Sequence, residues 1–320
     1  MSENYQWYPG HMTKARRAMQ EDIKLVDLVI ELIDARIPDS SRNPDIDSLA
    51  GGKSRIVLLN KADLADERVN KLWLEHFKEK GIYALALDSR NKSMAKRIDP
   101  VVKAACAEKI ERNKRRGILN RPMRAMVVGI PNVGKSTFIN SFSGRAVSKT
   151  GNKPGVTKGK QWVKLSNTLE LLDTPGILWP KFEDEKVGRN LAYIGSMNDE
   201  ILQKYELSRK LAEFLIKEYP GILEERYPVA DSGAEMGTSP DGEVLKSLKA
   251  GTGSPDLKSG AGKEALKSLK AGSEDNMIRR IALSRHCLQK GGEPDIEKAA
   301  CILLDDFRSG RIGKISMERP

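Results

Sequence analysis

The order of two short motifs constrains the fold of this chain more than any other feature. Asn60–Asp63 reads Asn-Lys-Ala-Asp, the pattern of a guanine-reading signature, and it precedes Gly129–Ser136, which reads Gly-Ile-Pro-Asn-Val-Gly-Lys-Ser. The second pattern is that of a phosphate-binding loop. In ordinary small GTPases the phosphate loop comes first, so this order predicts a circular permutation. The expected fold class is α/β: a circularly permuted P-loop GTPase domain, with a parallel sheet and helices on both faces, followed by a small all-α C-terminal domain.

The phosphate-loop motif stands in the context that its chemistry requires. The apolar run 124–128 predicts a buried strand, and residues 135–142 can open a helix. Glycines in the loop allow its backbone N–H groups to surround an anion. The alternative is a glycine-rich turn before a helix, which would not require the full motif. Lys135 is expected to reach the β- and γ-phosphates, and Ser136 to offer its hydroxyl to Mg²⁺. The predicted phosphate contacts are Asn132, Val133, Gly134, Lys135, Ser136 and Thr137.

The guanine-reading signature follows another apolar run, residues 55–59, which suits a central parallel strand. The Asp63 carboxylate can accept from the ring N–H and the exocyclic amine of guanine, while Asn60 faces the other edge of the base and the Lys61 stem lies along the ring. Adenine presents the wrong donors and acceptors, and would leave Asp63 unpaired. Taken alone, the tetrapeptide also fits a surface helix cap at Asp63. Ser89, after the strand-like run 83–87, is the expected second guanine-side contact.

Two further segments supply the remaining parts of a nucleotide site. Asp173–Gly176 reads Asp-Thr-Pro-Gly and follows the strand-like run 169–172, which would bring Asp173 to the Mg²⁺ shell and the Gly176 N–H to the γ-phosphate. Thr157 lies in a stretch rich in Gly, Lys and Pro and is expected to close over Mg²⁺ when a γ-phosphate is present. Mg²⁺ is therefore the predicted cofactor, with Ser136, Thr157 and Asp173 as its protein ligands.

Motifs outside these signatures also occur in a characteristic order. They are Trp7–Met12, Asp34–Pro38 with Ser40–Pro44, Pro154–Thr157, Asp173–Pro180 and, near the end of the chain, Ser309–Ser316. Together they resemble the bacterial ribosome-assembly GTPases of the YlqF/RbgA type, over residues 5 to about 228 and again from about 277 to 320. The resemblance implies hydrolysis of GTP to GDP, coupled to late maturation of the large ribosomal subunit. The implied partners are GTP or GDP, the large subunit and its rRNA.

One departure from ordinary GTPases concerns the attacking water. Ile177 stands where a water-orienting Gln would follow the Asp-x-x-Gly motif, and an aliphatic side chain cannot position a water by hydrogen bonding. The resemblance suggests His11 as the catalytic group, and a structural role for His11 in the N-terminal turn is equally open. A second candidate is K⁺, because Asn132 matches the residue that potassium-dependent relatives use as a ligand. Asn is also an ordinary turn residue.

The charge of the chain favours a polyanionic partner. There are 55 Lys and Arg against 44 Asp and Glu, which gives a net charge of +11. Basic residues gather near the N-terminus, over residues 112–124 and near the C-terminus, and a solvated helix face is the alternative for any one group. Low intrinsic turnover would follow if a ribosomal particle completes the catalytic site. The C-terminal group contains the predicted RNA contacts Arg308, Arg311 and Lys314.

The expected domains are a GTPase domain over residues 1–184 and a helical RNA-binding domain over residues 185–320. Residues 231–275 are rich in Gly, Ser and Lys and contain a near repeat, which predicts a disordered insertion. No apolar signal region begins the chain, no run is long enough to span a bilayer, and the three cysteines lack metal spacing, so a cytoplasmic protein with no membrane partner is expected. The alternative function is a GTP-dependent RNA-binding or chaperone module with incidental hydrolysis.

Overall fold

The computed structural model describes residues 19–91, 95–119, 121–143, 161–173, 184–197, 203–229 and 274–320. These residues fall into two compact units, one within residues 1–202 and 308–320 and the other within residues 203–307. The boundary expected from the sequence lay instead between residues 184 and 185. In the structure the helix α7 (Glu185–Tyr193) and the last residues of the chain belong to the first unit.

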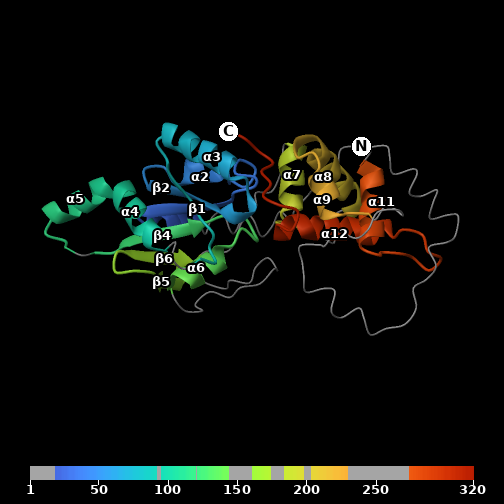
Figure 1. The fold of residues 1–320 in the computed structure, drawn as a ribbon. Coiled ribbons are helices and arrows are strands. Elements are labelled where there is room, and N and C mark those ends of the chain that lie inside the picture. The colour runs from blue at the N-terminus through green and yellow to red at the C-terminus, as the bar shows by residue number, and fades with distance from the viewer. Residues whose placement is uncertain are drawn as a thin grey trace. The chain divides into compact units, whose positions relative to one another are not determined.

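A six-stranded sheet forms the centre of the first unit, with the strand order β3-β2-β1-β4-β6-β5 (Figure 1). All seven residues of β1 are buried, as expected for a strand that is covered on both faces. Five of its seven residues are apolar, without the alternation of a strand that has one face in solvent. The strands are β1 (Leu28–Asp34), β2 (Ser54–Asn60), β3 (Tyr83–Ala86), β4 (Met123–Val128), β5 (Gln161–Lys164) and β6 (Leu169–Asp173).

The sheet is parallel except at one edge. Strands β3, β2, β1, β4 and β6 pair in parallel, whereas β5 pairs with β6 in the antiparallel sense. A short turn joins β5 to β6, and its backbone closes through the Leu165 N–H, which donates to the Leu169 carbonyl at 3.0 Å. A connection of this length can only reverse the chain, because a parallel pair requires a long crossover.

Helices on the first unit bury apolar residues of the sheet. The helix α3 (Glu67–Glu79) packs Trp73 and Phe77 against Val57 and Leu59 of β2, and the side chain of Asp66 caps its first turn by accepting from the Arg68 N–H at 2.7 Å. Residues 19–24 are also helical and bury Met19 and Ile23 with residues of β1 and β4. The remaining elements of this unit include α2 (Asp45–Leu49), the 3₁₀ turn η1 (Ala62–Leu64) and α6 (Lys135–Ser143).

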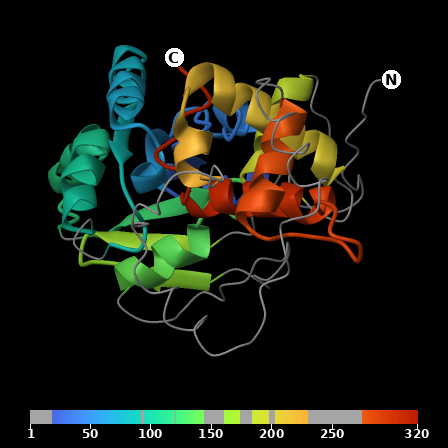
Figure 2. The same ribbon diagram turned by 45° about the vertical axis from the view of Figure 1, so that its right-hand side comes forward.

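The basic segment before β4 forms two helices rather than one continuous helix. The helix α4 (Ala95–Ala105) ends at Cys106, whose φ of −106° and ψ of 14° depart from helical values, and α5 (Ala107–Arg115) begins after it. Cys106 is 1% exposed, so the bend is fixed by packing of this side chain. Both helices lie to one side of the sheet in two views that differ by 45° (Figures 1 and 2).

The second unit is helical, in agreement with the expected all-α region. Buried residues of its helices form its core, among them Leu211, Leu215, Ile278 and Leu303. Glu274 and Asp275, which the sequence analysis included in the insertion, start α11 instead; their carboxylates bind Arg209 and Tyr205 of α8, and these bonds hold the first turn of α11. The earlier part of the insertion, residues 231–273, lies outside the described residues. The helices are α8 (Lys204–Glu218), α9 (Ile222–Arg226), α11 (Glu274–Ser284) and α12 (Ile296–Ser309), which continues to the first residues of the C-terminal segment.

The connections of the sheet reverse direction between β1 and β4. After β1 the chain builds outward to β2 and β3, and then returns to add β4 on the other side of β1. Ligands of open α/β sheets bind at such a switch point, outside the carboxyl ends of the strands. The guanine-reading signature directly follows β2, and the phosphate loop directly follows β4, so both motifs reach this edge from opposite sides of β1.

Candidate nucleotide-binding site

The phosphate loop joins β4 to α6 and requires glycine at two close approaches. A Cβ atom on Gly129 would lie 2.5 Å from the Leu32 carbonyl oxygen, and one on Gly134 would lie 2.5 Å from Asn60 Nδ2. Gly134 also has a φ of +100°, a region that side-chain-bearing residues rarely adopt. Asn132 itself has a φ of 58°. The motif is therefore bent into a compact loop by its neighbours in space as well as by its own glycines.

The lysine and the hydroxyl residues of the phosphate loop lie at its carboxyl-terminal end and at the start of α6. Lys135 is buried, and its Nζ donates to the carbonyls of Gly129 at 2.9 Å and Ile130 at 3.0 Å, so the ammonium group lies across the loop. Ser136 and Thr137 follow in the first turn of α6. The N–H groups of a first helical turn have no partner within the helix and carry the positive end of the helix dipole. This end of α6 therefore suits a phosphate anion.

A divalent cation fits the residues at this end of the sheet. Asp173 ends β6, one residue past the pairing of Leu172 with Met126 of β4, and Ser136 is the second residue of α6, the helix that follows β4. A carboxylate-bearing residue and a hydroxyl-bearing residue thus come to the same edge of the sheet, and both offer the oxygen ligands that Mg²⁺ prefers. Thr157 and Gly176, the other predicted contacts in the two switch segments, lie outside the described residues, as does His11.

The guanine-reading signature has an available acceptor at Asp63. Lys61 adopts a left-handed φ of 56°, and Asp63 lies in the 3₁₀ turn η1 that follows. Asp63 Oδ1 is buried and accepts no hydrogen bond from the described residues, while Oδ2 forms an ion pair with Arg90. A buried, unpaired carboxylate oxygen is costly, so a ligand that donates to this atom would be stabilised by it.

Arg90 links the two loops on the guanine side. Its guanidinium group binds Asp63 and also Asp88, at 3.0 Å from Nε to Oδ1. Burial by itself would raise the pKa of Asp88, but the bonds from Arg90 lower that pKa below its ordinary value. The bond to Asp88 in turn raises the pKa of Arg90. Asp88 therefore remains ionised at neutral pH, and Arg90 joins it to Asp63.

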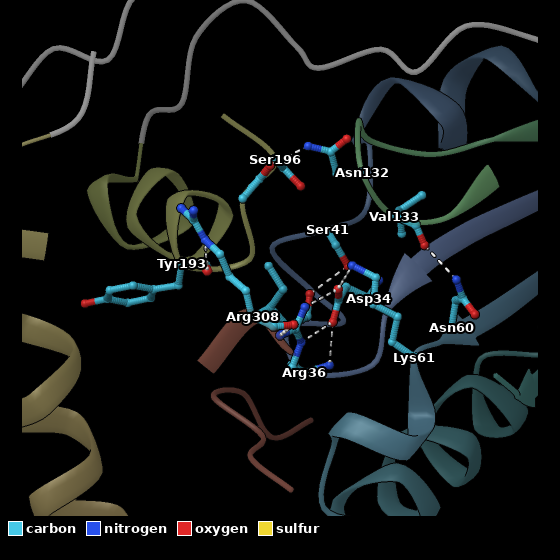
Figure 3. A network of polar contacts seen from close by, with 12 residues as sticks. Asp34, Arg36, Ser41, Asn60, Lys61, Asn132, Val133, Tyr193, Ser196 and Arg308 are labelled. Atoms are coloured by element: carbon cyan, nitrogen blue, oxygen red, sulfur yellow. Dashed lines mark hydrogen bonds and ion pairs between the residues drawn. The ribbon is translucent and has the colours of Figure 1, made fainter. Parts of the chain in front are cut away.

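Asn60 connects the guanine side to the phosphate side. Its Nδ2 donates to the Val133 carbonyl at 2.7 Å, and its Oδ1 accepts from the Ser89 N–H at 3.0 Å and the Ser89 hydroxyl at 2.6 Å (Figure 3 shows the bond to Val133). Asn60 and Ser89 are each 2% exposed. The sequence analysis gave both side chains a direct contact with the base, whereas in the structure these polar groups bind each other and the phosphate loop. They support the site by joining three loops.

A buried ion cluster lies behind the signature. Asp34 accepts from Arg36 at 2.9 Å on each of its two oxygens and forms an ion pair with Lys61 at 3.0 Å (Figure 3). Burial alone would raise the pKa of Asp34, but the charges of Arg36 and Lys61 lower that pKa well below its usual range. The cluster holds the ammonium group at the end of the Lys61 side chain, and sequence reasoning missed it. The only sequence signal was that Asp34–Pro38 stood among the motifs of the resemblance.

The phosphate loop also contacts the turn after α7. Asn132 Nδ2 donates to the Gly195 carbonyl at 2.6 Å, and the Ser196 hydroxyl donates to the Pro131 carbonyl at 2.9 Å. The first bond uses the amide nitrogen of Asn132 and orients its oxygen as the atom that could bind a cation. The turn at residues 195–196 is thereby fastened to the loop expected to cradle phosphates.

Of the three predicted RNA contacts, Arg308 has a different role in the structure. Its guanidinium group donates to the backbone carbonyls of Ala192 at 2.9 Å and Tyr193 at 3.1 Å (the latter in Figure 3). A cation used in this way is not available to a phosphate, so the prediction for Arg308 does not fit the structure. The sequence placed it at a helix end beside glycines, and only the fold reveals the carbonyls that it binds. Arg311 and Lys314 are exposed.

Comparisons with known proteins agree with this geometry. The profile of the 50S ribosome-binding GTPase family matches residues 124–227. Ribosome biogenesis GTPase A of Priestia megaterium is 43% identical over 98% of this chain and 96% of its own length, and that of Thermotoga maritima is 30% identical over 98% and 94%. Among solved structures, GDP-bound YlqF superposes with a TM-score of 0.61 at 25% identity, covering 95% of this chain and 99% of its own. GNP-bound YlqF from T. maritima gives 0.58 at 26%, over 96% and 98%.

Proposed function

The chain belongs to the ribosome biogenesis GTPase A family, and on that premise we propose that the particle it helps to mature is the large ribosomal subunit. As a member of this family it binds GTP, hydrolyses it, and acts in ribosome assembly. The proposed partner on the particle is its rRNA, and the proposed location is the cytoplasm, where bacterial ribosomes are assembled. No helix in the described part of the chain is long and apolar enough to cross a membrane.

The observation that carries the proposal is the bond between Asn60 and Val133. Residues from the guanine-reading signature and the phosphate loop, which are far apart in the sequence, meet at 2.7 Å. Asp63 presents an unpaired buried oxygen on one side of this contact, and Lys135 with the first turn of α6 lies on the other. A guanine nucleotide carries in one molecule both the hydrogen-bond donors that suit Asp63 and the phosphates that suit Lys135 and the first turn of α6.

The proposed roles of individual residues follow from this arrangement. Lys135 exchanges its bonds to loop carbonyls for the β- and γ-phosphates, and the N–H groups of residues 133–137 bind phosphate oxygens. Mg²⁺, the cofactor implied by the family, would be held by Ser136 and Asp173, with Thr157 as the proposed third ligand, and would neutralise charge on the phosphates. Gly176 is proposed to donate its N–H to the γ-phosphate. Asp63 selects guanine.

The proposed source of catalysis is His11 or a monovalent cation. Ile177 leaves the attacking water without a side-chain partner at the usual position. The His11 imidazole would orient or accept from this water, and K⁺ bound through Asn132 is the competing proposal. In either case the catalytic group is not the residue at position 177. A ribosomal particle that orders the segment carrying this group would raise the rate of GTP turnover.

GTP turnover is therefore expected to be slow for the isolated protein and about a hundredfold faster with large-subunit precursor particles. Phosphate release should be measured alone, with these particles and with small-subunit particles as the matched control. Stimulation by the large-subunit particle alone supports the proposal. Equal turnover in all three mixtures would favour the alternative, a GTP-dependent RNA-binding or chaperone module with incidental hydrolysis.

The proposed RNA contact involves exposed cations rather than Arg308. Arg112, Lys114 and Arg116, at the end of α5, are exposed, and no described carboxylate forms an ion pair with them. Arg121 and Arg124, which follow in the sequence, do pair with acids, at 3.6 and 3.7 Å. The proposed phosphate contacts are thus the end of α5 together with Arg311 and Lys314.

Replacing Arg112, Lys114 and Arg116 together with Ala is expected to weaken large-subunit binding and flatten its salt dependence. The slope of log K against log salt should fall by up to about 0.9 for each lost phosphate contact, while GTP affinity stays unchanged. The Arg311→Ala, Lys314→Ala double variant tests the C-terminal cations in the same way. A charge-matched control is the triple variant of Arg68, Lys78 and Lys80, exposed residues on or just after α3. An unaltered slope for the α5 variant would mean that these cations are only a solvated helix end.

A further inference from the structure

The C-terminal segment of the first unit lies along the loop that carries Asp63. The Ile315 N–H donates to the Leu64 carbonyl at 3.0 Å, and the Ser316 hydroxyl accepts from the Asp66 N–H at 3.1 Å. A Cβ atom on Gly310 would lie 2.5 Å from Leu64 Cδ2. The segment thus contacts the backbone and the side chain of the residue next to Asp63, and the red C-terminal trace passes beside α3 in Figure 1.

Glu318 anchors the end of this segment. Its carboxylate accepts from the Asp39 N–H at 2.7 Å, the Ser40 N–H at 3.1 Å and Asn190 Nδ2 at 2.8 Å, and it also binds the Ser40 hydroxyl. Its backbone carbonyl accepts from the Trp73 indole at 3.2 Å. Glu318 is 7% exposed. Hydrogen bonds to a buried carboxylate are among the stronger ones, so this residue fixes the position of the whole segment.

A second path leads from the segment to Lys61. The Met317 N–H donates to the Arg36 carbonyl at 2.8 Å, and the Arg36 guanidinium group donates to the Arg308 carbonyl at 3.3 Å. The same guanidinium group binds Asp34, which forms the ion pair with Lys61 (Figure 3). Arg36 is 1% exposed, so this arrangement is buried. The C-terminal segment therefore contacts the supports of both charged residues in the signature.

We propose that residues 310–318 are a positioning element for guanine recognition, which holds Asp63 and Lys61 in the geometry that reads the base. The proposal rests on the assignment of Asp63 to guanine. By reciprocity, a bound guanine base stabilises docking of the segment as much as the docked segment stabilises the bound base. Because the segment follows α12 without a linker, the last helix of the helical unit is joined directly to the element that positions the signature.

The test is the selectivity between GDP and IDP in a Glu318→Gln variant. Inosine lacks the exocyclic amine, so Asp63 gains one hydrogen bond from IDP and two from GDP. Loss of the Glu318 anchor is expected to weaken the binding of GDP about tenfold. It is also expected to lower the ratio of the IDP dissociation constant to the GDP dissociation constant towards one. An anchor that only stabilises the fold would leave this ratio at the wild-type value. Arg319→Gln is the matched control, an exposed residue that directly follows the segment.

Two further measurements keep the proposal falsifiable. Ser316→Ala removes the bond to the Asp66 N–H and should lower the same ratio to a smaller extent, even if Glu318→Gln does not fold. Hydrogen exchange at the Ile315 and Met317 amides should slow when GDP is added to the wild-type protein. A wild-type ratio in both folded variants, together with exchange that GDP does not alter, overturns the proposal. An Asp63→Asn variant that keeps its guanine preference would instead overturn the assignment of Asp63 itself.

Discussion

Asp63→Asn is expected to weaken GTP binding about a thousandfold and to turn the base preference towards xanthosine nucleotides. The carboxylate accepts from two guanine donors, whereas the amide can accept from one and must donate to the other position. Guanine has an amine there, which repels the amide, and xanthine has an oxygen, which accepts from it. The unpaired Asp63 Oδ1 in the structure is the atom that makes this substitution severe.

Titration with GTP, XTP and ATP measures this effect. Asp88→Asn is the matched control, because Asp88 binds the same Arg90 and is changed in the same way. We expect Asp88→Asn to keep the preference for GTP over XTP, since the loss of a bond to Arg90 is common to both variants. If Asp63→Asn also keeps that preference, Asp63 does not contact the base.

His11→Ala is expected to lower particle-stimulated GTP turnover about a hundredfold while leaving GTP affinity nearly unchanged. The imidazole is assigned to the attacking water, which contributes to the transition state and not to binding of the ground-state nucleotide. Lys135→Ala should instead weaken nucleotide binding, because the ammonium group is assigned to the phosphates. Single-turnover rates and nucleotide dissociation constants, measured on the particle, separate the two effects.

The same assay distinguishes catalysis by the histidine from catalysis by a monovalent cation. His76→Ala, on α3, is the control for loss of a histidine that contacts Trp73 rather than the nucleotide. Normal turnover of His11→Ala in potassium buffer would exclude the histidine. In that case, exchange of K⁺ for Na⁺ should lower the turnover of the wild-type protein, and Asn132→Ala should abolish the difference between the two ions.

The place of the helical unit in the chain provides a physical link between particle binding and the nucleotide state. It is inserted between two parts of the first unit, which end at residue 202 and resume at Arg308. Arg308 binds the carbonyls of Ala192 and Tyr193, close to the turn whose Gly195 carbonyl holds Asn132 of the phosphate loop. Arg308, at which the chain returns to the first unit, is thus tied through this turn to the phosphate loop. A change in the phosphate loop therefore has a short path to the residue that follows the helical unit.

The sequence by itself determined the parts of this protein that depend on local chemistry. Apolar runs specified the strands before both motifs, and glycine with lysine and serine specified the phosphate loop, because each conformation is selected by residues within a few positions. The reversed order of the motifs was sufficient to predict the permutation. It was also sufficient to predict that Asp63 and Lys135 belong to one site, since the carboxyl ends of parallel strands meet at one edge.

Tertiary structure alone decided which polar groups were already occupied. From the sequence, Arg308 was expected to be an available cation, but in the structure its guanidinium group donates to the carbonyls of Ala192 and Tyr193. The Ser89 hydroxyl, whose expected contact was the base, binds Asn60, and Glu318, near the end of the chain, is buried against Ser40 and Asn190. Hydrogen bonds saturate, and the partners of these groups are brought to them by chain closure from far along the sequence. A pattern of neighbouring residues contains no record of those partners, so the use of each polar group is fixed only when the chain has folded.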